Sequence, residues 1–133
     1  MSDIEGFDLS ASPPNIPARI RTERLASTTA VVTVGGELDI QSAGYLQAEL
    51  VGAITGGAET IVVDLGSTTF IDSMALGVLL GAVRRLRERD GQLRIACADP
   101  NIRRILEITL LDRVFTIFDS RDAALEHLGA GAS

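Results

Sequence analysis

The sequence changes period between two neighbouring runs, Ile61-Val62-Val63-Asp64-Leu65 and Phe70-Ile71-Asp72-Ser73-Met74-Ala75-Leu76-Gly77-Val78. The first run is apolar except for one acid, which is typical of a strand covered on both faces. In the second run apolar residues begin to recur at steps of three and four, which predicts a single buried helical stripe of Leu76, Leu79, Leu80, Val83 and Leu86. We therefore expect a strand ending at Leu65 and a helix running from Ser73 to about Arg89.

Ser73 lies at or beside the N-cap of that helix. Backbone N–H groups lack partners at this position, and the helix dipole favours negative charge there. A phosphoryl group on Ser73 would therefore be tolerated by its own helix. A partner protein docked there would meet a large change in charge.

The composition predicts one domain with an aliphatic core. The chain has 133 residues, 46% hydrophobic and only 4% aromatic, which is typical of an α/β layer structure. A net charge of −6 argues against a nucleic-acid surface as the main role. The single cysteine, Cys97, excludes an internal disulfide and fits a reducing cytosol. No apolar run approaches the length of a membrane span and no signal peptide opens the chain, so we expect a soluble, cytoplasmic protein.

Strands and helices are expected to alternate after an opening pair of strands. Residues 1–17 contain many helix- and strand-breaking residues and indicate a flexible lead. The domain is expected over residues 18–129 with a tail at 130–133. The predicted strands cover 18–23 (a polar edge strand), 30–34 (ended by Gly35-Gly36), 61–65, 93–97 and 114–118. The predicted helices cover 41–54 and 73–89, with two more that follow the caps Asp99 and Ser120.

This order, β-β-α-β-α-β-α-β-α, predicts a mostly parallel, mixed sheet of about five strands with about four helices. In such sheets the working surface tends to lie where strands give way to helix starts. Ser73 and Asp39 both belong to that edge. Taken alone, however, Asp39 and the pair Asp72-Ser73 are better interpreted as ordinary helix caps.

The combination of motifs is more specific than any one of them. The chain contains, in this order, Gly36-Glu37-Leu38-Asp39, a helix, the strand with Asp64, then Phe70-Ile71-Asp72-Ser73 and Leu76-Gly77-Val78. With these motifs it closely resembles a STAS domain, and more narrowly a free-standing bacterial anti-sigma factor antagonist. The later run Asp99-Pro100 with Arg103-Arg104-Ile105-Leu106 and Leu110 is also similar to that family. The resemblance extends from about Ile20 to Leu128 and implies the fold expected above.

The resemblance also implies a mechanism. The unmodified protein would bind an anti-sigma factor that is itself a serine kinase, and so release a sigma factor. Phosphorylation of Ser73 would end that binding, and a serine phosphatase would reset the cycle. The residues expected to contact the partner are Asp39, Asp72, Ser73, Met74, Ala75 and Val78.

Two positions after Ser73 depart from the family pattern. The family continues with a second Ser or Thr and then Gly, whereas this chain has Met74 and Ala75. Ala75 adds a methyl group where a kinase needs close approach, and Met74 is an adaptable apolar residue. Either both pack under a neighbouring loop, or they change partner preference, or they slow or abolish phosphorylation. Met74, Val78 and Ala82 form a second apolar strip, which is either a docking patch or core.

The remaining polar and small residues favour structural roles. Gly77 and Gly81 suggest close packing of helix on sheet. Cys97 is expected in the core and His127 in a structural or solvent-exposed role. A solvated basic helix end is expected from Arg84, Arg85, Arg87 and Arg89.

Enzyme classes are poorly supported. His127, the one histidine, lies far along the chain from Ser73, and no Gly-x-Ser-x-Gly elbow exists. One His and one Cys give no convincing metal ligand set, and the chain has no lysine for a phosphate-binding loop. A receiver-type domain is also disfavoured, because the strand over 30–34 does not end in an acidic pair. We therefore expect no catalytic residue, metal or cofactor. The alternative function is a non-switching STAS scaffold, or an accessory subunit of a lipid-transport complex.

Overall fold

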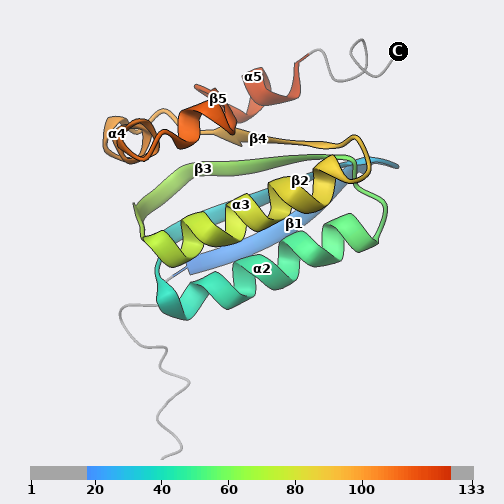
Figure 1. The fold of residues 1–133 in the computed structure, drawn as a ribbon, viewed down its shortest axis with the longest axis horizontal. Helices are drawn as coiled ribbons and strands as arrows, with labels where there is room; N and C mark the ends of the chain where they lie inside the picture. Colours follow the sequence, from blue (N-terminus) through green and yellow to red (C-terminus); the bar gives the residue numbers. More distant parts are fainter. Residues whose placement is uncertain (1–17, 127–133) are drawn as a thin grey trace, which may run out of the picture.

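The computed structural model describes residues 18–126, which form a five-stranded mixed sheet with helices on both faces (Figure 1). The strands are ordered along the sheet as they occur in the chain: β1 (Ala18–Ala26), β2 (Thr29–Leu38), β3 (Thr60–Ile71), β4 (Gln92–Ala96) and β5 (Thr116–Phe118). β1 pairs antiparallel to β2, and every later pair is parallel. The predicted α/β class, the mixed sheet and the edge position of the first strand are confirmed.

Four α-helices and one short 3-10 helix complete the described region. They are α2 (Ile40–Thr55), α3 (Ser73–Arg87), α4 (Pro100–Ile108), η1 (Leu111–Arg113) and α5 (Arg121–Leu125). Each α-helix begins after a side-chain cap, supplied by Asp39, Asp72, Asp99 and Ser120. These caps, and with them the predicted helix starts, are confirmed to within one residue. The expectations for residues 1–17, His127, Leu128 and the tail lie outside the described residues.

Alternation along the strands separates the two faces of the sheet. Val32 and Val63 belong to the large core that α2, α3 and α4 cover. Val31 and Val62 point to the opposite face, where they pack with Ala124 of α5 in a smaller cluster. The central strands are thus buried on both faces, which explains their continuously apolar sequence.

β2 and β3 are both longer than the sequence predicts. The strands do not end at Gly35-Gly36 and Leu65 but continue side by side to Leu38 and Ile71. Two register shifts interrupt this extension, and Gly36 takes a φ of 97° beside one of them. Only glycine adopts that backbone conformation readily, so the glycines mark bulges rather than the end of a strand.

Polar side chains support this extension. The Asp64 carboxylate accepts a hydrogen bond from the Gly66 N–H at 2.9 Å. Thr68 is buried and donates its hydroxyl proton to the Val34 carbonyl at 3.1 Å. The polar segment after Leu65 therefore belongs to the sheet because it pairs with a distant strand. The local hydrophobic pattern does not reveal such pairing.

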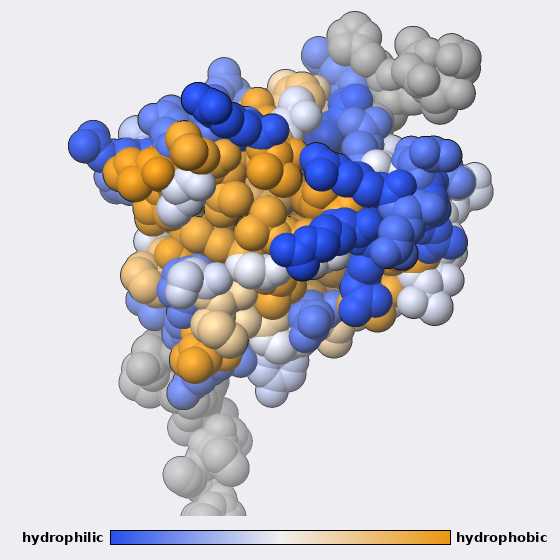
Figure 2. Space-filling view, viewed as in Figure 1, coloured by the Kyte–Doolittle hydropathy of each residue, from blue (hydrophilic) through white to orange (hydrophobic). Residues whose placement is uncertain are grey.

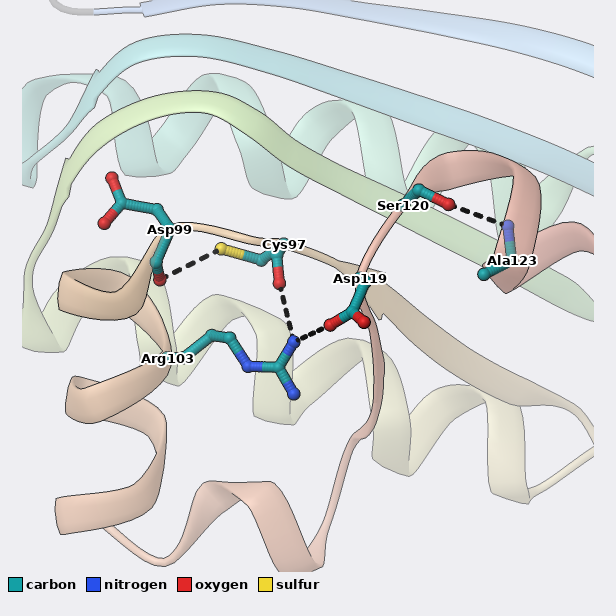
Figure 3. A network of polar contacts seen from close by, with 6 residues as sticks. All are labelled: Cys97, Asp99, Arg103, Asp119, Ser120 and Ala123. Carbon is teal, nitrogen blue, oxygen red and sulfur yellow. Dashed lines mark hydrogen bonds and ion pairs between the residues drawn. The ribbon is translucent and has the colours of Figure 1, made fainter.

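The last part of the sheet is shorter than predicted. β5 begins at Thr116 rather than residue 114, because the chain first makes the 3-10 turn η1. Arg103 of α4 ties this part to the sheet: its guanidinium donates to the Cys97 carbonyl at 3.1 Å and pairs with Asp119 at 2.5 Å (Figure 3). Cys97 is buried in the main core, as expected.

Candidate functional site

The helices α2 and α3 begin at the same end of the sheet. Leu38 and Ile71, the last residues of β2 and β3, are partners in the parallel register. The Asp72 N–H donates to the Leu38 carbonyl at 3.0 Å, which holds the two strand-to-helix junctions together. The sequence prediction that Asp39 and Ser73 share one edge of the sheet is confirmed.

Both junction acids are engaged as helix caps. Asp39 accepts hydrogen bonds from the N–H groups of Gln41 and Ser42 at 3.0 and 3.1 Å, and the Ser42 hydroxyl accepts from the Asp39 N–H in return. Asp72 accepts from the Ala75 N–H at 3.0 Å. These carboxylates are therefore fixed in place and add negative charge beside the helix N-termini.

Ser73 is exposed at the first position of α3. Within residues 18–126 its hydroxyl makes no hydrogen bond, so it is free to react or to contact another molecule. Its neighbour Met74 is 52% exposed although it is a large apolar residue. The hydroxyl and the thioether thus lie together on an open surface.

Further exposed apolar residues flank the caps. Ile40, directly after Asp39, is 67% exposed, and Phe70, two residues before Asp72, is 46% exposed. We call Ile40, Phe70, Ser73 and Met74 the helix-start rim. The sequence analysis did not single out Ile40 and Phe70 as contact residues, although a large apolar residue beside a helix cap could have indicated an exposed contact position. Such exposure around a fixed polar centre is typical of a protein-binding surface.

A groove continues from the rim between α2 and α3, which pack against each other. Its volume is about 370 Å³, and its lining is mostly apolar: Gln47, Leu50, Val51, Ile54, Ser73, Met74, Gly77, Val78, Gly81, Ala82 and Arg85. Figure 2 shows hydrophobic surface gathered over this face and a hydrophilic band toward the side where α3 ends. We call this feature the α2/α3 groove.

The groove corrects the interpretation of Gly77 and Gly81. A Cβ atom added at either position would meet nothing within 4 Å, so neither glycine serves close packing of helix on sheet. Both instead leave open space along the groove. Val78 is half-buried and Ala82 is buried at its base, so the second apolar strip contributes to both groove and core.

Ala75 is not part of this surface. Its side chain is fully buried in the main core, and we therefore remove it from the expected partner contacts. The same burial shows that the extra methyl group points inward and does not lie on the exposed surface beside Ser73. Of the two unusual residues only Met74 changes the exposed surface.

The described residues present an exposed, partly apolar surface around the two helix starts. Within residues 18–126 no three His, Cys, Asp or Glu side chains gather as a metal site. No helix in that range is long and apolar enough to cross a membrane. This order of elements, with an exposed serine at the second of two adjacent helix starts, agrees with the arrangement that the resemblance to a STAS domain implies.

Comparison with known proteins agrees with this class. The STAS domain model matches residues 19–124. BtrV of Bordetella bronchiseptica, whose name assigns it as an anti-sigma factor antagonist, is 31% identical over 94 residues, which are 71% of this chain and 81% of that protein. An anti-sigma F factor antagonist of Paenibacillus polymyxa is 29% identical over 74% of this chain and 85% of its own.

Solved structures show the same fold. An anti-sigma factor antagonist from Mycobacterium paratuberculosis superposes with a TM-score of 0.78 at 25% identity, covering 89% of this chain and 98% of that one. Unphosphorylated SpoIIAA, another anti-sigma factor antagonist, matches with a TM-score of 0.75 at 22% identity, over 84% of this chain and 97% of its own. The chain belongs to the STAS domain family, within its group of anti-sigma factor antagonists.

Proposed function

We propose that this chain binds an anti-sigma factor through the helix-start rim and thereby releases a sigma factor. The relatives are named as antagonists of anti-sigma factors, which supports this class of partner. In this role the chain acts by binding rather than catalysis, in the cytoplasm, and the functional domain spans residues 18–129. Asp39, Asp72, Ser73, Met74 and Val78 are the proposed contacts, extended by Ile40 and Phe70.

We further propose that the anti-sigma factor is a serine kinase, that it phosphorylates Ser73, and that a serine phosphatase reverses the step. The kinase would transfer the γ-phosphoryl group of ATP to the Ser73 hydroxyl oxygen, leaving ADP. The observation that carries this proposal is the exposed hydroxyl of Ser73, which makes no hydrogen bond within residues 18–126 and lies between a capping carboxylate and an apolar rim.

The switch follows from electrostatics. Phosphate adds about −1.5 to −2 charges at neutral pH. The helix N-terminus stabilises that charge within the free protein, so the fold stays as it is. A partner that buries the rim must exclude water from the phosphate, which costs desolvation free energy, and the phosphate is also repelled by the neighbouring Asp72 carboxylate. About 1.4 kcal/mol of added cost lowers affinity tenfold, and a few kcal/mol end binding at cellular concentrations.

The test begins with the partner. The unmodified chain is used to capture its anti-sigma factor from native cytosol, and the captured protein is purified and incubated with the chain and ATP. We expect one phosphate, located at Ser73 by mass spectrometry, followed by release. Ser73→Ala should bind and stay bound. Release of the Ser73→Ala variant under the same conditions would overturn the assignment of Ser73.

A non-switching STAS scaffold, or an accessory subunit of a lipid-transport complex, is the second candidate. Its support is Met74, which puts an exposed apolar side chain where the family motif has a second Ser or Thr. Such a surface favours permanent docking. Stable binding to a captured partner with no modification of Ser73 in the presence of ATP would favour this candidate.

A further inference from the structure

We infer that the first residues of the chain bind in the α2/α3 groove and cover it. The occupant is the segment Asp3-Ile4-Glu5-Gly6-Phe7-Asp8-Leu9, joined to β1 by residues 10–17. The groove therefore carries its own competitor for any partner that docks there. This regulatory consequence rests on the proposed function, whereas occupancy of the groove does not.

The groove has room for large apolar side chains. Gly77 and Gly81 lie one turn apart on α3 and leave open space above the helix backbone. Val51 and Met74 form apolar walls on the two sides. An aromatic ring laid over the two glycines would bury the face that points toward the helix, which is favourable by about 25 cal/mol per Å² of apolar surface.

The segment supplies matching side chains. It contains Ile4, Phe7 and Leu9, three large apolar residues within six positions, whereas the rest of residues 1–17 contains only Met1 and Ile16 as large apolar residues. In a charged and glycine-containing segment these residues have no core of their own to enter. The groove offers them a mostly apolar lining.

Charge sets the direction of the segment. Residues 1–17 contain the acids Asp3, Glu5 and Asp8 and no Arg or Lys. The far end of the groove is lined by Arg85, and neighbouring Arg84 is also exposed on α3. Neither arginine forms an ion pair within residues 18–126. Acids at the start of the chain and arginines at the end of the groove are therefore complementary.

The length of chain is sufficient. Ala18 pairs with Gly36, so β1 begins at the end of the sheet where α2 and α3 start. Packed helices lie about 8–10 Å apart, and eight linker residues reach about 25 Å, enough to pass the start of α2 and enter beside Ser73. From Ser73 to Arg85 the groove rises about 18 Å along the helix, a span that six extended residues cover.

A weak contact is enough to fill the groove. A short linker gives an effective concentration in the millimolar range, so a segment with an intrinsic Kd near 1 mM is bound about half of the time or more. A partner that needs the same groove then binds with an apparent Kd equal to its intrinsic Kd divided by the fraction of molecules whose groove is empty. Removing the apolar side chains of the segment should raise partner affinity severalfold.

The test uses the full chain without any partner. Met1 and Met74 are its two methionines, so methyl NMR of ¹³C-methionine gives one reporter inside the groove. In the double variant Phe7→Ser/Leu9→Ser we expect the Met74 methyl resonance to move, because the aromatic ring leaves. Oxidation of Met74 by peroxide should become severalfold faster. The control Ser10→Ala/Ser12→Ala changes the same part of the chain and should leave both readouts unchanged.

Charge is tested separately. Arg85→Gln should move the Met74 resonance in the same direction as the double variant, whereas Arg104→Gln, an exposed arginine on α4, should not. Identical Met74 shifts and oxidation rates in the wild-type chain and the double variant would overturn the inference. A shift that depends on protein concentration would assign the groove to a second copy and would also overturn it. Neither readout involves Ser73 phosphorylation, so a failure here is distinct from a failure of the proposed switch.

Discussion

Gly77 and Gly81 illustrate how single residues shape the surface of this domain. Glycine in a helix interior is less stable than alanine by about 0.5–1 kcal/mol, and here no neighbour requires its small size. The two positions therefore keep the groove open at a cost in stability. Because these glycines lower helix stability and no packing contact requires them, the space that they leave in the groove best explains their presence.

Gly81→Ala should raise the free energy of unfolding by about 0.5–1 kcal/mol, measured by urea denaturation. Gly52→Ala, in open space on α2 outside the groove lining, is the matched control and should gain a similar amount. Gly91→Ala should lose stability instead, because its Cβ would clash with the Glu59 carbonyl oxygen. A destabilised Gly81→Ala variant would contradict the open geometry.

Cys97 provides a pH-dependent prediction. Burial raises the pKa of its thiol above the ordinary value of 9.0. The folded state therefore favours the neutral thiol, and the stability linked to it is complete below about pH 9 and is lost as pH rises through the folded pKa. Denaturation between pH 8 and 10.5 should show a decline that Cys97→Ala reduces. An equal decline in both proteins would show that other groups control it.

At the scale of elements, the sequence predicted what depends on local pattern. Helix starts follow from capping residues such as Asp99 with Pro100, and buried stripes such as Leu79 and Leu86 follow from their spacing. These features need no knowledge of distant residues. They account for the correct order and class of the elements.

The sequence could not predict features that depend on pairing between distant segments. The extension of β3 to Ile71 requires β2 alongside it, with bulges that resemble turns in the sequence. The 3-10 turn before β5 follows Leu110, whose φ of 62° is unusual for a leucine. The groove likewise requires two helices to be placed side by side, so the position of Gly77 on it was missed.

The junction of α4 with the sheet depends on Arg103. Its bond to the Cys97 carbonyl is half-buried, whereas its partner Asp119 is 86% exposed and contributes little by ion pairing (Figure 3). Arg103→Ala should lower the free energy of unfolding by about 1–2 kcal/mol. Asp119→Ala should lower it by less than about 0.5 kcal/mol, as should the control Arg104→Ala. Equal losses for Arg103→Ala and Asp119→Ala would show that the ion pair carries the contact.

For the molecule as a whole, the fold separates stability from recognition. The central strands are buried on both faces and hold the junctions of α2 and α3 in fixed register. The exposed rim and the groove lie on this rigid support. Because Ser73 is already exposed and the Asp72 carboxylate is already bonded to the backbone, the proposed phosphorylation of Ser73 would change surface charge without requiring a new backbone conformation.

The central claim is that charge at Ser73 determines whether the anti-sigma factor docks, and calorimetric affinity measures this directly. The captured anti-sigma factor is titrated with the unmodified chain, the Ser73-phosphorylated chain, Ser73→Ala and Ser27→Asp. Ser27→Asp is the control for added charge, because Ser27 lies in the turn after β1, at the opposite end of the sheet. We predict that phosphorylation weakens binding by about a hundredfold, or ~2.7 kcal/mol, while both variants stay within about threefold of the unmodified chain. Equal affinities of the phosphorylated and unmodified chains would contradict the account.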